Sequence, residues 1–454
     1  MARAVVIGGG IGGLTSGIAL RRNGWDVTVL ERAPKIDPVG SGLAIAANAL
    51  KALDTLGLGD HIRTLSRIQG QVGIRRADGR WLVHTTPDAA EARYGDSVVL
   101  MLRATLMEVL ADALGADQLR LGVGVSGVDA EEGIVHTEDG DLGADLVVAA
   151  DGIHSKVRQT LFPEHPGPTY SGVTAWRGLI PRGDLDIRST ESWGKGLVFG
   201  VTPLAHDLVY VYATDVLPAG TVFGDEREEL LRRFGDWHDP IPALLRAADP
   251  GMIIRNDVYS FDTPLPAFHR GKVALVGDAA HPMTPNLGQG ACQAIEDAVV
   301  LAHLAGFPAG EEDIAHNGKE RTLDGTHGGV RRADGGGGID REGRGGAGAS
   351  GEGDGGEWGH GRGALAGYLG AYTAARLGRT SKIVQRSMSI CRMTKVRNPV
   401  AVWLRDFGVS LAARSMPDMM LRSMDEVLRW RPPVTAPASG PASDMGDRHP
   451  LQGR

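Results

Sequence analysis

The sequence has few cysteines, no excess of positive charge and no long apolar run, and each absence narrows its possible functions. Of the 454 residues only Cys292 and Cys391 are cysteines, too few for a disulfide framework and without metal-ligand spacing. We therefore expect a reducing, cytoplasmic location and no metal site. The formal net charge of −7 argues against a nucleic-acid partner. No apolar run reaches the roughly 18 residues of a membrane span, so we expect no stable membrane insertion. The opening "MARAVVIGGG" does not resemble a signal peptide.

Two segments differ in composition from the rest of the chain. Residues 306–363 are dominated by glycine with interspersed charges, and such a segment cannot bury enough apolar surface to offset its ordering entropy. We predict a disordered insertion there. The alternative, an RNA-binding Gly/Arg segment, would need an aromatic-arginine pattern that is missing. The tail, residues 431–454, is rich in Pro, Ser and Ala and is also predicted to be disordered.

The order of the remaining patterns predicts an α/β protein of two to three domains. A strand, "RAVVIGG", a helix, "GGLTSGIALRRNG", and a second strand, "DVTVLER", open the chain. Short alternating strands then fill 171–269, and "GKVALVGD" returns to a buried strand of the parallel type. We expect a discontinuous Rossmann-type domain, 1–170 with 270–305, an inserted β-sheet substrate domain, 171–269, and C-terminal helices over 364–430.

The first motif is a glycine-rich turn between the first strand and the first helix. Gly8, Gly10 and Gly13 have the GxGxxG spacing, and Glu31 ends the next strand at the expected distance. Such glycines allow a tight turn, approach of the backbone to a pyrophosphate and close helix packing, while the acid can accept hydrogen bonds from a ribose. The motif predicts a dinucleotide, but it does not choose between NAD and FAD.

The segment "GKVALVGDAAHPMTPNLGQGACQAIEDA" favours FAD. A buried strand ends at Gly277-Asp278, and a helix begins near Gly288 after a proline-containing loop. Asp278 can accept hydrogen bonds from a ribityl chain, and the positive end of the helix can stabilise the negative charge of a reduced flavin. An ordinary strand-to-helix connection would not explain two prolines and paired glycines so close together.

Three motifs together resemble the fingerprints of the single-component FAD-dependent aromatic hydroxylases and monooxygenases, which share the para-hydroxybenzoate hydroxylase fold. They are the glycine turn, "ADGIHSKVR" (150–158) and the Gly277–Ala298 segment. The pattern is most similar to urate hydroxylase, salicylate hydroxylase and zeaxanthin epoxidase-like members, over Met1 to about Leu304 and again from about Ala364. The resemblance implies that NADH or NADPH reduces FAD. It also implies that O2 then gives a flavin C4a-hydroperoxide, which transfers one oxygen atom to a small aromatic or other electron-rich substrate.

The resemblance also implies a set of cofactor-binding residues. They are Gly8, Gly10, Gly12, Gly13, Glu31, Arg32, Arg103, Asp151, Asp278, Leu287, Gly288, Gln289, Gly290 and Ala291. Within "ADGIHSKVR", Asp151 would anchor a turn that serves both FAD and NAD(P)H, and Arg158 would place a charge near phosphates. Two alternatives remain open, because Asp151 could be a helix N-cap and Arg103 could be a solvated residue at a helix start.

Substrate contacts are expected from aromatic residues of the β-sheet domain, namely Trp176, Phe199, Tyr210 and Tyr212. For the tyrosines, packing in the domain core is the alternative. Tyr210 falls at a substrate-contacting tyrosine of the urate hydroxylases, but the arginine that those enzymes carry upstream is missing from Gly196-Leu197-Val198. A neutral phenol, quinone precursor, indole or isoprenoid-like compound is therefore favoured over a purine. Catalytic candidates are Tyr210, His281 and Pro285, although for His281 a surface or packing role is favoured over that of a base.

Other functions remain possible at this point. An NAD(P)-dependent dehydrogenase would share only the first motif, and a flavin-binding protein without activity would share the FAD site alone. An FAD-dependent epoxidase of an isoprenoid-like substrate and a non-oxygenating flavoprotein reductase are the closest alternatives to a hydroxylase. The expected partners are a small-molecule substrate and O2, and the expected assembly is a monomer or homodimer.

Overall fold

The structure is a computed structural model that describes residues 1–36, 41–66, 70–306, 359–416 and 418–433. The predicted disordered insertion and tail therefore lie almost entirely outside the described residues. Among the described helices, none combines the length and the apolar character that crossing a membrane would require.

The first sheet is the Rossmann-type sheet that the sequence predicts. Its six strands have the order β17-β18-β11-β1-β2-β7, and all neighbours are parallel except β17 and β18. The strands are β1 (Arg3–Ile7), β2 (Asp26–Glu31), β7 (Leu119–Leu121), β11 (Leu146–Ala149), β17 (His269–Arg270) and β18 (Val273–Leu275). Val5, Val148 and Leu275 are fully buried, as expected for parallel strands covered on both faces.

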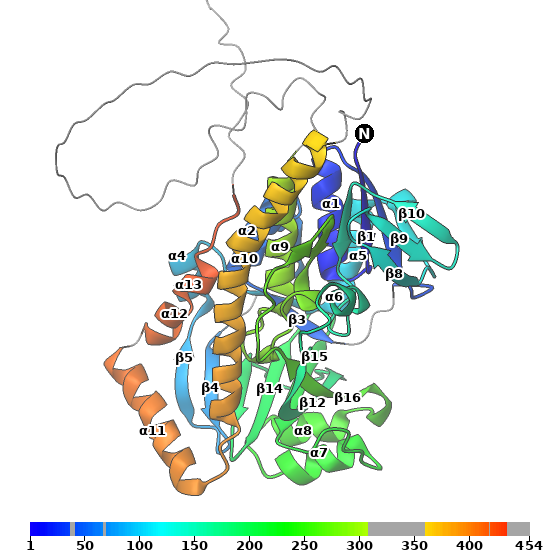
Figure 1. Cartoon of the computed structure of the whole chain (residues 1–454). Helices are drawn as coiled ribbons and strands as arrows, with labels where there is room; N and C mark the ends of the chain where they lie inside the picture. Colours follow the sequence, from blue (N-terminus) through cyan, green and yellow to red (C-terminus); the bar gives the residue numbers. More distant parts are fainter. Residues whose placement is uncertain (37–40, 67–69, 307–358, 417, 434–454) are drawn as a thin grey trace, which may run out of the picture.

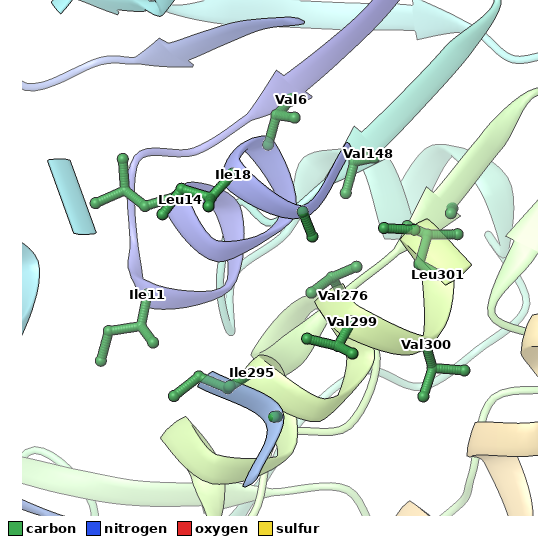
Figure 2. Close-up of a cluster of buried hydrophobic side chains, with 14 of the residues drawn as sticks. Val6, Ile11, Leu14, Ile18, Val148, Val276, Ile295, Val299, Val300 and Leu301 are labelled. Carbon is green, nitrogen blue, oxygen red and sulfur yellow. The ribbon is translucent and has the colours of Figure 1, made fainter. Parts of the chain in front are cut away.

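Two helices fix the position of the first sheet's loops. Helix α1 (Ile11–Arg22) follows β1 directly, and helix α9 (Gly290–Ala305) packs against it. Figure 2 shows Leu14 and Ile18 of α1 in the same cluster of buried side chains as Ile295 and Val299 of α9. Both helices begin at the carboxyl ends of the strands, where open α/β sheets bind their ligands.

The second sheet has seven strands in the order β16-β12-β15-β14-β13-β4-β5. They are β4 (Val72–Arg76), β5 (Trp81–Thr85), β12 (Thr169–Pro181), β13 (Thr190–Trp193), β14 (Leu197–Pro203), β15 (Leu208–Asp215) and β16 (Ile254–Ser260). Strands β4 and β5 come from the part of the chain that we assigned to the FAD domain. Strand β4 joins the sheet by pairing in parallel with β13, so the substrate sheet extends beyond 171–269. Helices α7 (Glu226–Phe234) and α8 (Ile241–Ala247) cover one face.

Smaller elements connect and cover the two sheets. The two-stranded sheet β3 (Gly42–Ile45) and β6 (Val99–Leu102) and the three-stranded sheet β8 (Val125–Asp129), β9 (Ile134–Thr137) and β10 (Gly140–Gly143) are antiparallel. The other helices include α2 (Ala47–Thr55), α3 (Gly59–Leu65), α4 (Pro87–Tyr94), α5 (Arg103–Leu114), α6 (Lys156–Leu161), α12 (Met419–Ser423) and α13 (Asp425–Leu428).

The predicted C-terminal helices are present. Helix α10 (Gly359–Thr394) runs from the first sheet's end of the molecule to the second sheet's end, beside α9 (Figure 1). Helix α11 (Pro399–Ser415) packs on the edge strand β5. In Figure 1, α7 and α8 lie at the end of the molecule opposite α1 and β8–β10.

Candidate active site

A cavity of about 620 Å³ lies between the loops of the first sheet and one face of the second sheet. On one side it is lined by the glycine turn after β1 and by the segment from Val276 to Ala294. On the other it is lined by residues of β12 to β15, including Tyr210 and Tyr212. The volume is that of a small-molecule site. The structure thus brings together motifs that are more than 250 residues apart in the sequence.

The glycine turn after β1 is shaped by steric limits. A Cβ on Gly13 would lie 1.8 Å from the carbonyl oxygen of Gly8, so only glycine lets α1 approach the strand this closely. Gly10 and Gly12 line the cavity, and a Cβ on Gly10 would meet no atom within 4 Å. The backbone at Gly10 is therefore open to a ligand, while Gly8 and Gly13 close the turn behind it.

Glu31 lies beside this turn without lining the cavity. Its carboxylate accepts hydrogen bonds from the backbone N–H groups of Gly9, at 2.7 Å, and Ala33, at 2.8 Å. These bonds fix the acid at the end of β2, as the predicted ribose contact requires. Its neighbour Arg32 is exposed.

Asp278 and Arg103 meet at the cavity wall. Asp278 follows the buried strand β18, and Arg103 begins helix α5. Desolvation raises the pKa of the Asp278 carboxyl, while electrostatic interactions with His281, Arg103 and Arg158 lower it. Arg103 is therefore close enough to Asp278 to act on its charge.

The turn at residues 150–158 holds two loops together. Helix α6 is capped by Ser155, whose side chain accepts the Arg158 N–H, so Asp151 is not the N-cap. One Asp151 oxygen accepts the Val157 N–H at 3.3 Å, and the other, buried, has no partner among the described residues. Arg158 is buried and donates to the carbonyls of Ile153, at 2.7 Å, and Ala279, at 3.1 Å. Arg158 does not line the cavity, and its guanidinium ties this turn to the Asp278 loop. Its expected position near phosphates stays a prediction.

The loop before α9 turns backbone groups toward the cavity. Gly288 has a left-handed backbone, with φ of 60°, and lines the cavity together with Gln289, Gly290 and Ala291. No side chain caps α9, so its first N–H groups and the positive end of its dipole are free to meet a ligand. Pro285 also lines the cavity, whereas Leu287 packs against the main hydrophobic core.

A buried charged cluster supports this loop from behind. Asp297 accepts hydrogen bonds from the Gly277 N–H at 2.9 Å and from Arg376 Nε at 2.6 Å, and Arg376 also donates to Glu296 at 2.5 Å. Burial raises the pKa of Asp297, but the positive charges of His281 and Arg376 lower it to about 2. The sequence signal for this cluster is the acidic pair in the otherwise apolar "ACQAIEDAVVLA", which lies outside the glycine and proline positions that mark the motif.

His281 belongs to this buried cluster. Its Nε2 lies 2.5 Å from an oxygen of Asp297, its side chain contacts Phe268, and the residue is only 3% exposed. It does not line the cavity. The assignment of His281 as a catalytic candidate therefore does not agree with its position, which is that of a residue supporting the Asp278 loop.

The second sheet presents alternate residues to the cavity. Tyr210 and Tyr212 of β15 line it, as do Arg177 of β12 and Val198 of β14. Side chains along a strand alternate between the two faces, so Trp176 and Phe199 point into the core under α7 and α8, where they are 1% and 0% exposed. The expectation that Trp176 and Phe199 contact the substrate is wrong for this reason.

Two charged residues in this wall were not among our candidates. Arg177 lies on β12, the strand that pairs with the strand of Tyr210. Burial raises the pKa of the Tyr210 hydroxyl, and Arg177 opposes that rise. Glu191 of β13 accepts the Tyr212 hydroxyl at 2.5 Å and the Trp193 indole N–H. Burial raises the pKa of Glu191, although both hydrogen bonds lower it. No motif marked either residue, because only strand pairing brings them to the cavity.

Comparison with known proteins identifies the family of proteins to which this cavity belongs. Residues 1–193 and 262–312 match the family described as FAD binding domain. The chain belongs to the single-component FAD-dependent aromatic hydroxylases. It is 42% identical to the aurachin C monooxygenase/isomerase of Stigmatella aurantiaca over 312 residues, which are 67% of this chain and 81% of the relative. It is 32% identical to an FAD-dependent urate hydroxylase of Klebsiella pneumoniae over 309 residues, or 66% and 80% of the two chains.

Solved structures agree with this membership. The crystal structure of Klebsiella pneumoniae HpxO complexed with FAD and uric acid matches with a TM-score of 0.73 and 26% identity, covering 92% of this chain and 95% of that chain. The predicted fold class, FAD cofactor and enzyme class are confirmed: this hydroxylase is an FAD-dependent monooxygenase that uses NADH or NADPH. The alternatives of an NAD(P)-dependent dehydrogenase and an inactive flavin-binding protein are thereby set aside.

The residues of this hydroxylase fit FAD. The open backbone at Gly10 and the uncapped start of α9, which both line the cavity, are suited to pyrophosphate and flavin groups respectively. When bound, FAD supplies the redox chemistry, taking reducing equivalents from NADH or NADPH and passing them to O2.

Proposed function

We propose that the protein hydroxylates a planar aromatic heterocycle of the quinolone type, held between FAD and the inner face of the second sheet. One observation carries the proposal. A single cavity joins Asp278 and the start of α9 to Tyr210 and Tyr212, so one space can hold both a flavin ring and an aromatic substrate.

Each part of the cofactor has residues suited to it. We assign the pyrophosphate to the Gly10–Gly12 backbone, the adenosine ribose to Glu31 and Arg32, and the ribityl chain to Asp278 and Arg103. The backbone from Gly288 to Ala291 would meet the ring edge, where the positive end of α9 stabilises negative charge. Asp151 would bind a polar group through its unpartnered oxygen.

Two observations support a quinolone rather than a purine. The run Gly196-Leu197-Val198 lacks the arginine that the urate hydroxylases carry upstream of the tyrosine, and Val198 lines the cavity, so β14 offers no cation there. Relatives include the aurachin C enzyme, at 42% identity, and the 2-heptyl-3-hydroxy-4(1H)-quinolone synthase of Pseudomonas aeruginosa, at 34%. Arg177 can donate to a ring carbonyl, and Tyr210 and Tyr212 offer aromatic faces for ring packing.

The location and assembly remain predictions. We propose a cytoplasmic enzyme, on the basis of the two free, buried cysteines. We also propose that it acts as a monomer or homodimer and takes O2 and a small molecule as its partners.

The proposal is tested by a substrate screen on the FAD-loaded protein. Quinolones, phenols, indoles and urate are compared for their ability to accelerate NADH or NADPH oxidation, and products are identified by mass spectrometry. We expect a quinolone to give the largest acceleration and a product heavier by one oxygen atom. Preference for urate, or acceleration without an oxygenated product, would contradict the proposal.

A further inference from the structure

Glu191 has only neutral hydrogen-bond partners, unlike the buried acids Glu296 and Asp297. Its two carboxylate oxygens accept from the Tyr212 hydroxyl and the Trp193 indole, and in the described part of the chain it forms no ion pair. Glu296 and Asp297, in contrast, contact the arginine Arg376. The pKa of Glu191 is raised, whereas the pKa values of Glu296 and Asp297 are lowered.

A carboxylate in this position has acceptor capacity left over. Its two oxygens offer about four lone-pair sites, of which two are used. A buried charge without a counter-charge is costly, and a neutral side chain could hold Tyr212 and Trp193 equally well. A purely structural role therefore does not explain an acid here.

Glu191 lies at the cavity wall. Glu191 and Ser189 line it, while the intervening and following residues of β13 face the other side, where Ser192 contacts His238 at 2.8 Å. Arg177 lines the same cavity from β12, so the wall offers a hydrogen-bond donor at one place and an acceptor at another. A substrate with a carbonyl and an N–H group on one ring system is complementary to both.

We propose that Glu191 accepts a hydrogen bond from a ring N–H or phenolic O–H of the substrate and so selects substrates that carry such a donor. This inference rests on the proposed function, because it places the substrate in the same cavity. If the donor ionises during the reaction, its N–H or O–H bond breaks and the proton passes to a Glu191 oxygen, without any transfer of electrons.

The test compares two probes that differ only in the donor, 4(1H)-quinolone and N-methyl-4-quinolone. Binding to the FAD-loaded protein is followed by calorimetry and by the change in the flavin spectrum. Hydrogen bonds to charged groups predict that the wild type prefers the N–H probe about 10- to 100-fold. In Glu191→Gln the preference should fall by about 10-fold or more. Ser192→Ala, on the opposite face of the same strand, should keep the wild-type preference.

A second measurement needs no variant. Protonation removes the negative charge, so the preference of the wild-type protein for the N–H probe should weaken as the pH falls through the pKa of Glu191. An equal preference in wild type and Glu191→Gln, a pH-independent preference, or failure of both probes to bind the wild type would each overturn the inference. A different result would contradict the proposed function, namely that no quinolone gives an oxygenated product.

Discussion

The loops of the first sheet and the inner face of the second sheet meet at one cavity, but they build it in different ways. The loops present backbone groups, as at Gly10 and at the start of α9, and bury their charges behind the surface. The sheet presents side chains, such as Arg177 and Glu191, directly to the cavity. If FAD and the substrate bind as proposed, the cofactor common to the family would be met mainly by main chain, and the substrate mainly by side chains, which can change without altering the fold.

Among the substitutions in the loops, those within the glycine turn should have the largest effect on folding and FAD binding. Gly13→Ala places a Cβ 1.8 Å from the Gly8 carbonyl oxygen, so we expect little folded protein, measured by soluble yield and circular dichroism. Gly10→Ala is the matched control, because its Cβ meets no atom within 4 Å. It should fold and yet bind FAD weakly. Normal folding and FAD content in Gly13→Ala would contradict this account of the turn.

Removal of Asp278 should separate cofactor binding from folding. Asp278→Ala removes the acid at the cavity wall, and we expect a folded but largely FAD-free protein, measured by the ratio of flavin to protein absorbance. Asp141→Ala, an exposed acid on β10, should leave that ratio unchanged. A fully yellow Asp278→Ala protein would rule out the assigned contact with FAD.

Substitutions in the charged cluster behind the loops should lower the free energy of unfolding. Arg376→Met leaves Glu296 and Asp297 without their shared buried partner, and loss of one side of a buried ion pair costs about 3–5 kcal/mol. Arg379→Met is the control, since Arg379 is partly exposed and contacts Glu296 alone of the two acids, so its cost should be smaller. Denaturant unfolding measures both, and equal stabilities of the two variants would contradict the central position of Arg376.

The same cluster predicts a dependence of stability on pH. The pKa of Asp297 is about 2, below its ordinary value, so its contribution is fully present above the ordinary carboxyl pKa and is lost as the pH falls toward 2. The full loss from this group is about 2 kcal/mol, and about half of it falls between pH 6 and pH 3. Comparing unfolding of the wild type and Asp297→Asn between pH 6 and pH 3 measures it, and parallel curves would show that Asp297 is not responsible.

Loss of one hydroxyl on the second sheet should reduce substrate affinity without affecting FAD binding. Tyr210→Phe removes a polar group at the cavity beside Arg177, and we expect substrate affinity to fall by about 10-fold, the value of one hydrogen bond, with FAD content unchanged. Tyr170→Phe is the control, because its hydroxyl donates to the Leu217 carbonyl outside the cavity lining. Titration of the identified substrate measures both; loss of FAD instead of substrate affinity would contradict the assignment.

The two sides also differed in how far the sequence predicted them. Gly10, Arg103 and Asp278 were found in advance because contiguous motifs record the turns and helix starts that hold them. The cavity-facing residues of the sheet were harder to predict. A shift of one residue along the strand decides whether Phe199 or Val198 faces the cavity, and composition does not reveal that register. Glu191 and Arg177 became visible only through pairing between strands, and β4 joined the sheet from a distant part of the chain.

Oxygen labelling tests the central claim, that this cavity brings FAD and an aromatic substrate together so that oxygen from O2 is transferred to the ring. The FAD-loaded protein is supplied with NADH or NADPH, the best quinolone and 18O2, and the product is analysed by mass spectrometry. We predict a product that carries one 18O atom, formed in proportion to the NADH or NADPH consumed. An unlabelled product, or NAD(P)H consumption that yields only hydrogen peroxide with every aromatic compound tried, would contradict the account.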